Sequence, residues 1–126
     1  MRLLEEVVEL VPGVRATGAR RAAAGDFYFN GHFPGEPIVP AVILVEMLAQ
    51  AGGLAAAAPA AGGRASPRQL RVAGLGPFKF PAAARPGVLL EARARVAGRI
   101  GGLYKIDGDV TADGQLVATG SVTLAG

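Results

Sequence analysis

A chain of 126 residues has the length of one domain and too little sequence for two independent hydrophobic cores. Half of the residues are apolar (51%), which argues against disorder. Alanine and 19 glycines stand in place of most large side chains, so we expect a small core. Such a chain would bury more apolar surface by pairing with a second copy. A chain with no cysteine and one histidine cannot form disulfides, thiolate metal sites or cysteine nucleophiles, and it is a poor candidate for a zinc enzyme or any other metal site.

The charge pattern narrows the class of partner. Thirteen basic against ten acidic residues give a net charge of +3, which suits weak attraction to an acidic partner. The arginines are dispersed and the aromatic residues do not alternate with them, so we expect no nucleic-acid partner. The first ten residues, MRLLEEVVEL, are amphipathic and do not form a signal peptide, so we expect a cytoplasmic protein.

One apolar segment, Val39 to Ala61, is long enough to span a bilayer and contains a single charged residue, Glu46. It is mostly alanine and glycine and has prolines near both ends. It would also place a carboxylate inside the membrane, where an acid without a partner is costly in free energy. We therefore expect no membrane span.

The first elements in chain order are extended. Runs over Glu5–Val11 and Val14–Ala24 are predicted strands, joined by Pro12-Gly13, a pair typical of a type II turn. Phe27–Phe29 is predicted to be a short third strand. A loop dense in glycine and proline follows over residues 30–40.

The next segment, Ala41–Ala57, is predicted to be a helix. Its length exceeds that of a typical strand, and Pro40 stands where a proline is tolerated at a helix start. The segment is apolar around its whole circumference, so we expect it to be buried on all sides and wrapped by sheet.

After small-residue, loop-like sequence over Pro59–Pro67, the apolar period changes to two. Strands are predicted over Leu70–Phe80 and, with alternating polar residues, over Leu90–Val96, Leu103–Val110 and Leu116–Leu124. In the last of these we expect Leu116, Ala118, Val122 and Leu124 to face the core. Gly101-Gly102 and Asp113-Gly114 are hairpin signals between these strands. The sequence thus predicts a single α+β domain over residues 1–126, with one long buried helix and an antiparallel meander that has one polar face.

Two side chains are candidates for chemistry. His32, the only histidine, lies in the irregular loop GHFPG, where packing in a core strand is not its role, although a hydrogen-bonded loop histidine is the alternative. Glu46 is surrounded by apolar residues, so its carboxylate either finds a partner or its pKa rises, as a general acid requires. Gln50 shares its helix face and is placed to orient it. The alternative for Glu46 is pairing with an arginine or a buried backbone group.

An imidazole and a carboxyl form an acid–base couple without a nucleophile or a metal. The helix start near Ala41 lies between them in the sequence, and its free backbone N–H groups can bind developing negative charge on a carbonyl. This combination suits proton abstraction next to a carbonyl, followed by loss or gain of water. It does not suit phosphoryl transfer, because the chain has no glycine-rich lysine loop.

The segment FYFNGHFPGEPIVP, followed by VILVEMLAQA, resembles the beta-hydroxyacyl-acyl-carrier-protein dehydratases of type II fatty-acid synthesis. The GHFPG loop, the two spaced prolines and a glutamate fourteen residues after the histidine form the signature. Weaker similarity extends over nearly the whole chain and includes ELVPG near the start, FKFP, RPG and DGQLVA near the end.

The resemblance implies a hot-dog fold, in which a curved antiparallel sheet surrounds a central helix, and a homodimer or higher assembly with active sites at the subunit interface. By the same resemblance His32 removes the proton next to the thioester, Glu46 protonates the departing hydroxyl, and the N–H of Ala41 holds the thioester oxygen. The implied substrate is an acyl chain on the phosphopantetheine arm of acyl carrier protein, with no separate cofactor. The residues expected to bind it are Phe33, Gly35, Pro40, Val42 and Gln50.

The chain departs from the family pattern at three places. Ala41 stands where glycine is usual, Met47 stands where alanine is usual, and the usual N-terminal helix with its Pro-His-Arg type loop is missing, which affects the expected acyl tunnel. Glutamate at position 46, rather than aspartate, favours a dehydratase over a dehydratase–isomerase. Basic residues expected to dock an acidic carrier are Arg68, Arg71, Lys79, Arg85 and Arg99. The alternatives are an enzyme for coenzyme A or polyketide-type thioesters, and a non-catalytic acyl-binding subunit.

Overall fold

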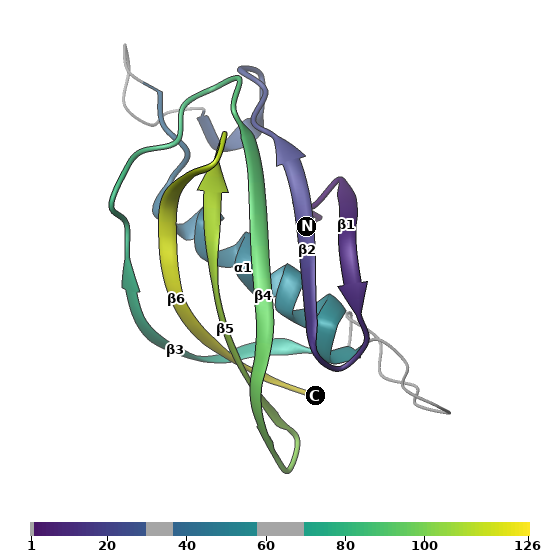
Figure 1. The fold of residues 1–126 in the computed structure, drawn as a ribbon. Coiled ribbons are helices and arrows are strands. Elements are labelled where there is room, and N and C mark those ends of the chain that lie inside the picture. Colours follow the sequence, from purple (N-terminus) through teal and green to yellow (C-terminus); the bar gives the residue numbers. More distant parts are fainter. Residues whose placement is uncertain (1, 30–36, 58–69) are drawn as a thin grey trace.

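The computed structural model describes residues 2–29, 37–57 and 70–126. Its elements in chain order are β1 (Glu6–Val11), β2 (Arg15–Arg21), the 3₁₀ turn η1 (Phe27–Phe29), α1 (Ala41–Ala57), β3 (Arg71–Lys79), β4 (Leu89–Ile100), β5 (Leu103–Ala112) and β6 (Gln115–Ala125). The six strands form one antiparallel sheet in the order β1-β2-β4-β5-β6-β3. The sheet curves around α1 (Figure 1), which confirms the predicted α+β class.

The tight turns have the geometry that their residues predict. The N–H of Val14 donates to the carbonyl of Val11 at 2.9 Å, and Gly13 has a φ of 76°, as the third residue of a type II turn requires. Asp113 and Gly114 both have positive φ, at 48° and 86°, which matches the twist of a two-residue hairpin between β5 and β6.

The meander has one apolar and one polar face, as predicted. In β4, Leu90, Ala92 and Ala94 are buried while Arg93 and Arg95 are exposed. The prediction for Leu116 in β6 is wrong, because this side chain is exposed and its neighbour is buried instead. The cause is a register shift in the β5–β6 ladder after Val110. Such a shift reverses which side chains of the strand face the core at this end.

The prediction of a strand at Phe27–Phe29 is also wrong. The segment is a 3₁₀ turn in which the N–H of Phe29 donates to the carbonyl of Asp26 at 3.1 Å. Tyr28 and Phe29 are both buried, whereas neighbouring residues of a strand would point to opposite faces. The Asp26 carboxylate closes the turn by accepting hydrogen bonds from the Ala23 N–H and the Tyr28 hydroxyl.

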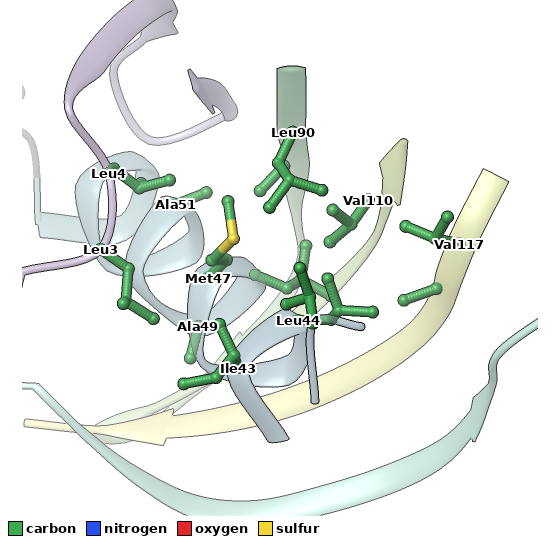
Figure 2. Close-up of a cluster of buried hydrophobic side chains, with 14 of the residues drawn as sticks. Leu3, Leu4, Ile43, Leu44, Met47, Ala49, Ala51, Leu90, Val110 and Val117 are labelled. Atoms are coloured by element: carbon green, nitrogen blue, oxygen red, sulfur yellow. The ribbon is translucent and has the colours of Figure 1, made fainter. Parts of the chain in front are cut away.

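Helix α1 has the predicted bounds and lies close to the middle of the sheet. Its N–H groups at Ile43 and Leu44 donate to the carbonyl of Pro40, so the helix begins directly after that proline. A side chain at Gly52 would lie 2.7 Å from Ile106, so this glycine lets the helix approach β5 closely. Figure 2 shows the buried core around α1; labelled there are Leu3, Leu4, Ile43, Leu44, Met47, Ala49, Ala51, Leu90, Val110 and Val117.

The expectation that α1 is buried on all sides is wrong. Val42 is 70% exposed, and Glu46, Gln50 and Leu54 are only partly buried. These four residues follow one another at a spacing of four, so they form a single stripe along the helix. The sheet covers one side of α1, and this stripe lies along the other.

Candidate active site

Glu46 lies on the uncovered stripe of α1 and lines a groove of about 820 Å³. The groove runs between the N-terminal segment and the start of β3, and much of its wall is apolar. Its lining residues are Arg2, Leu4, Glu6, Val7, Glu46, Ala49, Gln50, Gly53, Leu54, Leu70, Arg71, Val72 and Leu124. A carboxyl group in a mostly apolar groove of this size is a suitable arrangement for acid–base chemistry on a small substrate.

The Glu46 carboxylate has the partner that the helical spacing predicted. Gln50 donates from Nε2 to Oε2 of Glu46 at 3.1 Å. Its other amide atom, Oε1, accepts the backbone N–H of Leu3 at 2.8 Å, a contact that the sequence did not indicate. Among the described residues no salt bridge joins Glu46 to an arginine, so Gln50 meets the need for a partner.

The start of α1 is exposed at the surface, which an oxyanion site requires. Ala41 is the first helical residue, so its backbone N–H has no acceptor within the helix. Ala41 and Val42 are both exposed, whereas the preceding Val39 is buried and donates its N–H to the carbonyl of Ala84 at 2.7 Å. The role of Ala41 in binding an oxygen stays a prediction.

Several predicted site residues lie outside the described residues, namely His32, Phe33, Gly35 and Arg68. The structure therefore brings together Glu46 and Gln50 and places Pro40, Ala41 and Val42 at the start of the same helix. Whether the imidazole of His32 faces Glu46 stays a prediction from the sequence.

The four described basic residues of the predicted docking set do not form one patch. Arg71 lines the groove beside Glu46, whereas Lys79 lies at the opposite end of the same strand, β3. Arg85 is exposed and follows Ala84, whose carbonyl binds the N–H of Val39 just before α1 begins. The strand register puts Arg99 at the end of the sheet that holds Arg71, three strands away, where its guanidinium lies 4.9 Å from the ring centre of Tyr104. Arg71 thus lies at the groove of Glu46, and Arg85 lies near the segment that precedes α1.

Comparison with known proteins places this geometry in a family. Residues 1–121 match the family described as the FabA-like domain. The chain belongs to this family. Among its relatives are proteins named 3-hydroxyacyl-[acyl-carrier-protein] dehydratase FabZ from Roseiflexus sp. (strain RS-1), 37% identical over 98% of this chain and 84% of the relative, and from Chloroflexus aggregans, 36% identical over 98% and 83%. The family resemblance inferred from the GHFPG segment is confirmed.

Solved structures show the same fold. A chain of the dehydratase heterocomplex ApeI:P from Xenorhabdus doucetiae matches with a TM-score of 0.78 and 17% identity, over 98% of this chain and 82% of that one. The protein PH1136 from Pyrococcus horikoshii matches with a TM-score of 0.73 and 15% identity, over 98% and 82%. At these identities the likeness concerns the fold, and it confirms the hot-dog arrangement of this FabA-like domain.

The FabA-like domain also contains a partly buried charged cluster that sequence reasoning missed. Arg20 of β2 pairs with Asp26 at 3.0 Å, and their side chains are only 15% and 14% exposed. The Tyr28 hydroxyl donates to Oδ2 of Asp26 at 2.6 Å, and the Arg20 guanidinium lies over the Tyr28 ring. Only the position of Asp26 before three aromatic residues hinted at this cluster, because its partner comes from another element.

Burial, hydrogen bonding and charge shift the pKa values of all three side chains in this cluster, and that of Arg20 is raised. Burial alone would raise the pKa of Asp26, but hydrogen bonds from Tyr28 and Arg20, together with the charge of Arg20, outweigh burial and lower the pKa below 3.8. Burial and the hydrogen bond to Asp26 raise the pKa of Tyr28 to about 12. The cluster therefore holds an ionised Asp26 and a protonated Tyr28 across the ordinary pH range.

Within residues 2–29, 37–57 and 70–126, no group of three or more His, Cys, Asp or Glu side chains is placed to hold a metal ion. Over the same residues, no helix has the length and apolar character needed to cross a bilayer.

Proposed function

We propose that this chain is an enzyme that dehydrates (3R)-3-hydroxyacyl-[acyl-carrier-protein] to trans-2-enoyl-[acyl-carrier-protein] in type II fatty-acid synthesis, and catalyses the reverse hydration. The observation that carries the proposal is the Glu46 carboxylate, hydrogen-bonded to Gln50 and facing a groove with apolar walls. Membership of the FabA-like domain family supports it, as do relatives that match over nearly the whole of this chain and are named for this activity.

In the proposed reaction, His32 and Glu46 divide the two proton transfers. His32 takes the proton from the carbon next to the thioester carbonyl, and the electron pair forms the new double bond as the hydroxyl leaves. Glu46 gives its proton to that hydroxyl, so that water departs. The N–H of Ala41 stabilises negative charge that develops on the thioester oxygen. Phe33, Gly35, Pro40, Val42 and Gln50 line the bound substrate.

The substrate arrives on the phosphopantetheine arm of acyl carrier protein, so no separate cofactor is consumed. Arg71 at the groove and Arg85 near the segment that precedes α1 are basic residues that suit contact with an acidic carrier. We propose a homodimer in the cytoplasm in which His32 and Glu46 of one site come from different subunits. The uncovered stripe of α1 and the surface groove beside it support a second copy at this face.

The first experiment is hydration of a short trans-2-enoyl thioester, followed by loss of the absorbance of the conjugated enoyl group. His32→Ala is expected to abolish nearly all turnover, and Glu46→Gln to lower it by on the order of a hundredfold or more, with both variants folded. Glu9→Gln is the matched control, because Glu9 is a surface carboxylate, 50% exposed, that pairs with Arg15. Wild-type rates in either site variant would contradict the assigned roles.

Offering the same acyl group on acyl carrier protein and on coenzyme A separates the alternatives. If the enzyme prefers coenzyme A or a polyketide-type carrier, the proposed carrier is wrong, but the proposed dehydration chemistry stands. Arg71→Glu is expected to raise KM for the carrier-protein substrate about tenfold, because it reverses a charge that meets the acidic carrier. A folded protein that acts on none of these thioesters would be a non-catalytic acyl-binding subunit.

A further inference from the structure

A continuous series of polar contacts joins Glu46 to the partly buried cluster at Asp26. Gln50 donates to Glu46 at 3.1 Å and accepts the N–H of Leu3 at 2.8 Å. The carbonyl of the same Leu3 accepts a hydrogen bond from Nη1 of Arg20 at 3.2 Å. Nη2 of Arg20 then pairs with Oδ1 of Asp26 at 3.0 Å. These contacts connect α1, the N-terminal segment, β2 and the turn before η1.

We propose that Arg20 and Asp26 are positioning residues for Glu46 and act on it through the backbone of Leu3 and the side chain of Gln50. The inference rests on the proposed function in so far as Glu46 is the catalytic acid. The contacts themselves exist whichever reaction the groove serves.

The backbone of Leu3 determines which way the Gln50 amide faces. An N–H group can only donate, so the atom of Gln50 that meets the Leu3 N–H must be the oxygen, Oε1. The amide nitrogen Nε2 is thereby turned toward Glu46 and donates to Oε2. With Oε2 occupied in this way, the proton that Glu46 delivers resides on its other oxygen, Oε1. The Leu3 backbone thus selects the oxygen of Glu46 that carries the proton.

Arg20 and Asp26 hold Leu3 where this selection needs it. Leu3 precedes β1, so a side chain rather than a neighbouring strand satisfies each of its backbone polar groups. Its own side chain is fully buried in the core. Two nitrogens of one guanidinium bind different acceptors, the Leu3 carbonyl and the Asp26 carboxylate. This geometry suits the planar guanidinium of arginine and not the single ammonium group of lysine.

The burial of this ion pair argues for a specific role. The Arg20–Asp26 side chains are about 15% exposed, against 53% and 50% for Arg15 and Glu9, the pair that joins the neighbouring strands β1 and β2. Removing two charges from water costs free energy that offsets much of their attraction, so we assign this pair a positioning role rather than a large gain in stability. The geometry that this pair specifies is the position of Leu3.

The kinetic test uses Arg20→Met, with Arg15→Met on the same strand as the matched control. Arg20→Met is expected to lower kcat by on the order of tenfold with KM nearly unchanged, because a misdirected acid affects the chemical step rather than binding. Arg20→Lys is expected to fall between wild type and Arg20→Met. In a Gln50→Ala background the Arg20 substitution should have no further effect on kcat, since the connection is already broken. An undiminished effect in that background would overturn the proposal.

A second test does not depend on activity and separates this proposal from the proposed function. In ¹⁵N NMR spectra, Arg20→Met is expected to shift the Leu3 amide and the side-chain NH₂ signals of Gln50, and Arg15→Met is expected to leave them in place. Unchanged Gln50 signals in folded Arg20→Met, or in Arg20→Lys if the methionine variant does not fold, would overturn the connection. Shifted signals in a protein without thioester activity would support the connection while the proposed function failed.

Discussion

The carboxylate of Asp26 and the hydroxyl of Tyr28 share a short hydrogen bond at 2.6 Å in a largely buried setting. Burial and this contact raise the pKa of Tyr28 to about 12 from an ordinary value of 10.0. The folded protein therefore holds the Tyr28 proton more tightly than the unfolded chain does. This contribution to stability is complete below pH 10 and is lost as the pH rises from 10 toward 12.

The variant that tests this effect is Tyr28→Phe, which keeps the ring and removes the titrating group. We expect the free energy of unfolding of wild type to fall more steeply than that of Tyr28→Phe between pH 10 and pH 12. The measurement is a series of urea unfolding curves at matched pH, and the difference between the two proteins removes the contributions of the other titrating groups. Parallel pH profiles would show that the Tyr28 proton has no such role.

The sequence predicted one half of the polar site and not the other. Gln50 is four residues from Glu46 on a helix, so their contact follows from the helical repeat. Arg20 meets Asp26 and Leu3 only after β2 has paired with its neighbours and a turn has formed at Asp26. Contacts that depend on such long-range placement leave no periodic signal in the sequence.

Two adjacent glycines of α1 face different surroundings and provide a matched test of how the helix packs. A methyl group on Gly52 would lie 2.7 Å from Ile106, which is fully buried on β5, whereas a methyl group on Gly53 would meet nothing within 4 Å. We expect Gly52→Ala to lower the free energy of unfolding by about 1–3 kcal/mol through crowding. Gly53→Ala should raise it by up to about 1 kcal/mol through better helix propensity.

Urea unfolding of the two alanine variants beside wild type measures both effects. Opposite signs are the expected result, because the gain in helix propensity is common to both positions and only the contact with β5 differs. A stabilised Gly52→Ala protein would mean that α1 does not lie as close to β5 as the structure places it.

Elements with a strong local signal were predicted well from the sequence. The bounds of α1 follow from Pro40 and an unbroken apolar run, and the hairpin turns follow from their glycines. The strand predicted at Phe27–Phe29 and the inward-facing Leu116 were wrong for a different reason. An aspartate side chain closes the first segment into a turn, and a register shift changes the face of the second. Both depend on tertiary contacts that override an aromatic run and an alternating pattern.

At the scale of the whole molecule, apolar surface remains at the groove and on both edge strands. Val7 and Val8 of β1 and Val72 and Leu75 of β3 are exposed, as is Val42 at the start of α1. Of these, Val7 and Val72 line the groove, and exposed apolar side chains at a groove are typical of a surface that another chain covers. The proposed homodimer would bury this surface, and the sequence already favoured pairing because its core is thin.

A mixed dimer tests whether the proposed sites are shared between subunits. One chain carries His32→Ala and the other Glu46→Gln, with different tags so that the mixed species can be purified. If each site takes His32 from one subunit and Glu46 from its partner, one site of the mixed dimer contains both substitutions and the other contains neither. The mixed dimer should then show about half the turnover of wild type, far above either variant alone. If each site lies within one chain, both sites carry a defect, and turnover in a verified mixed dimer would stay at the level of the variants.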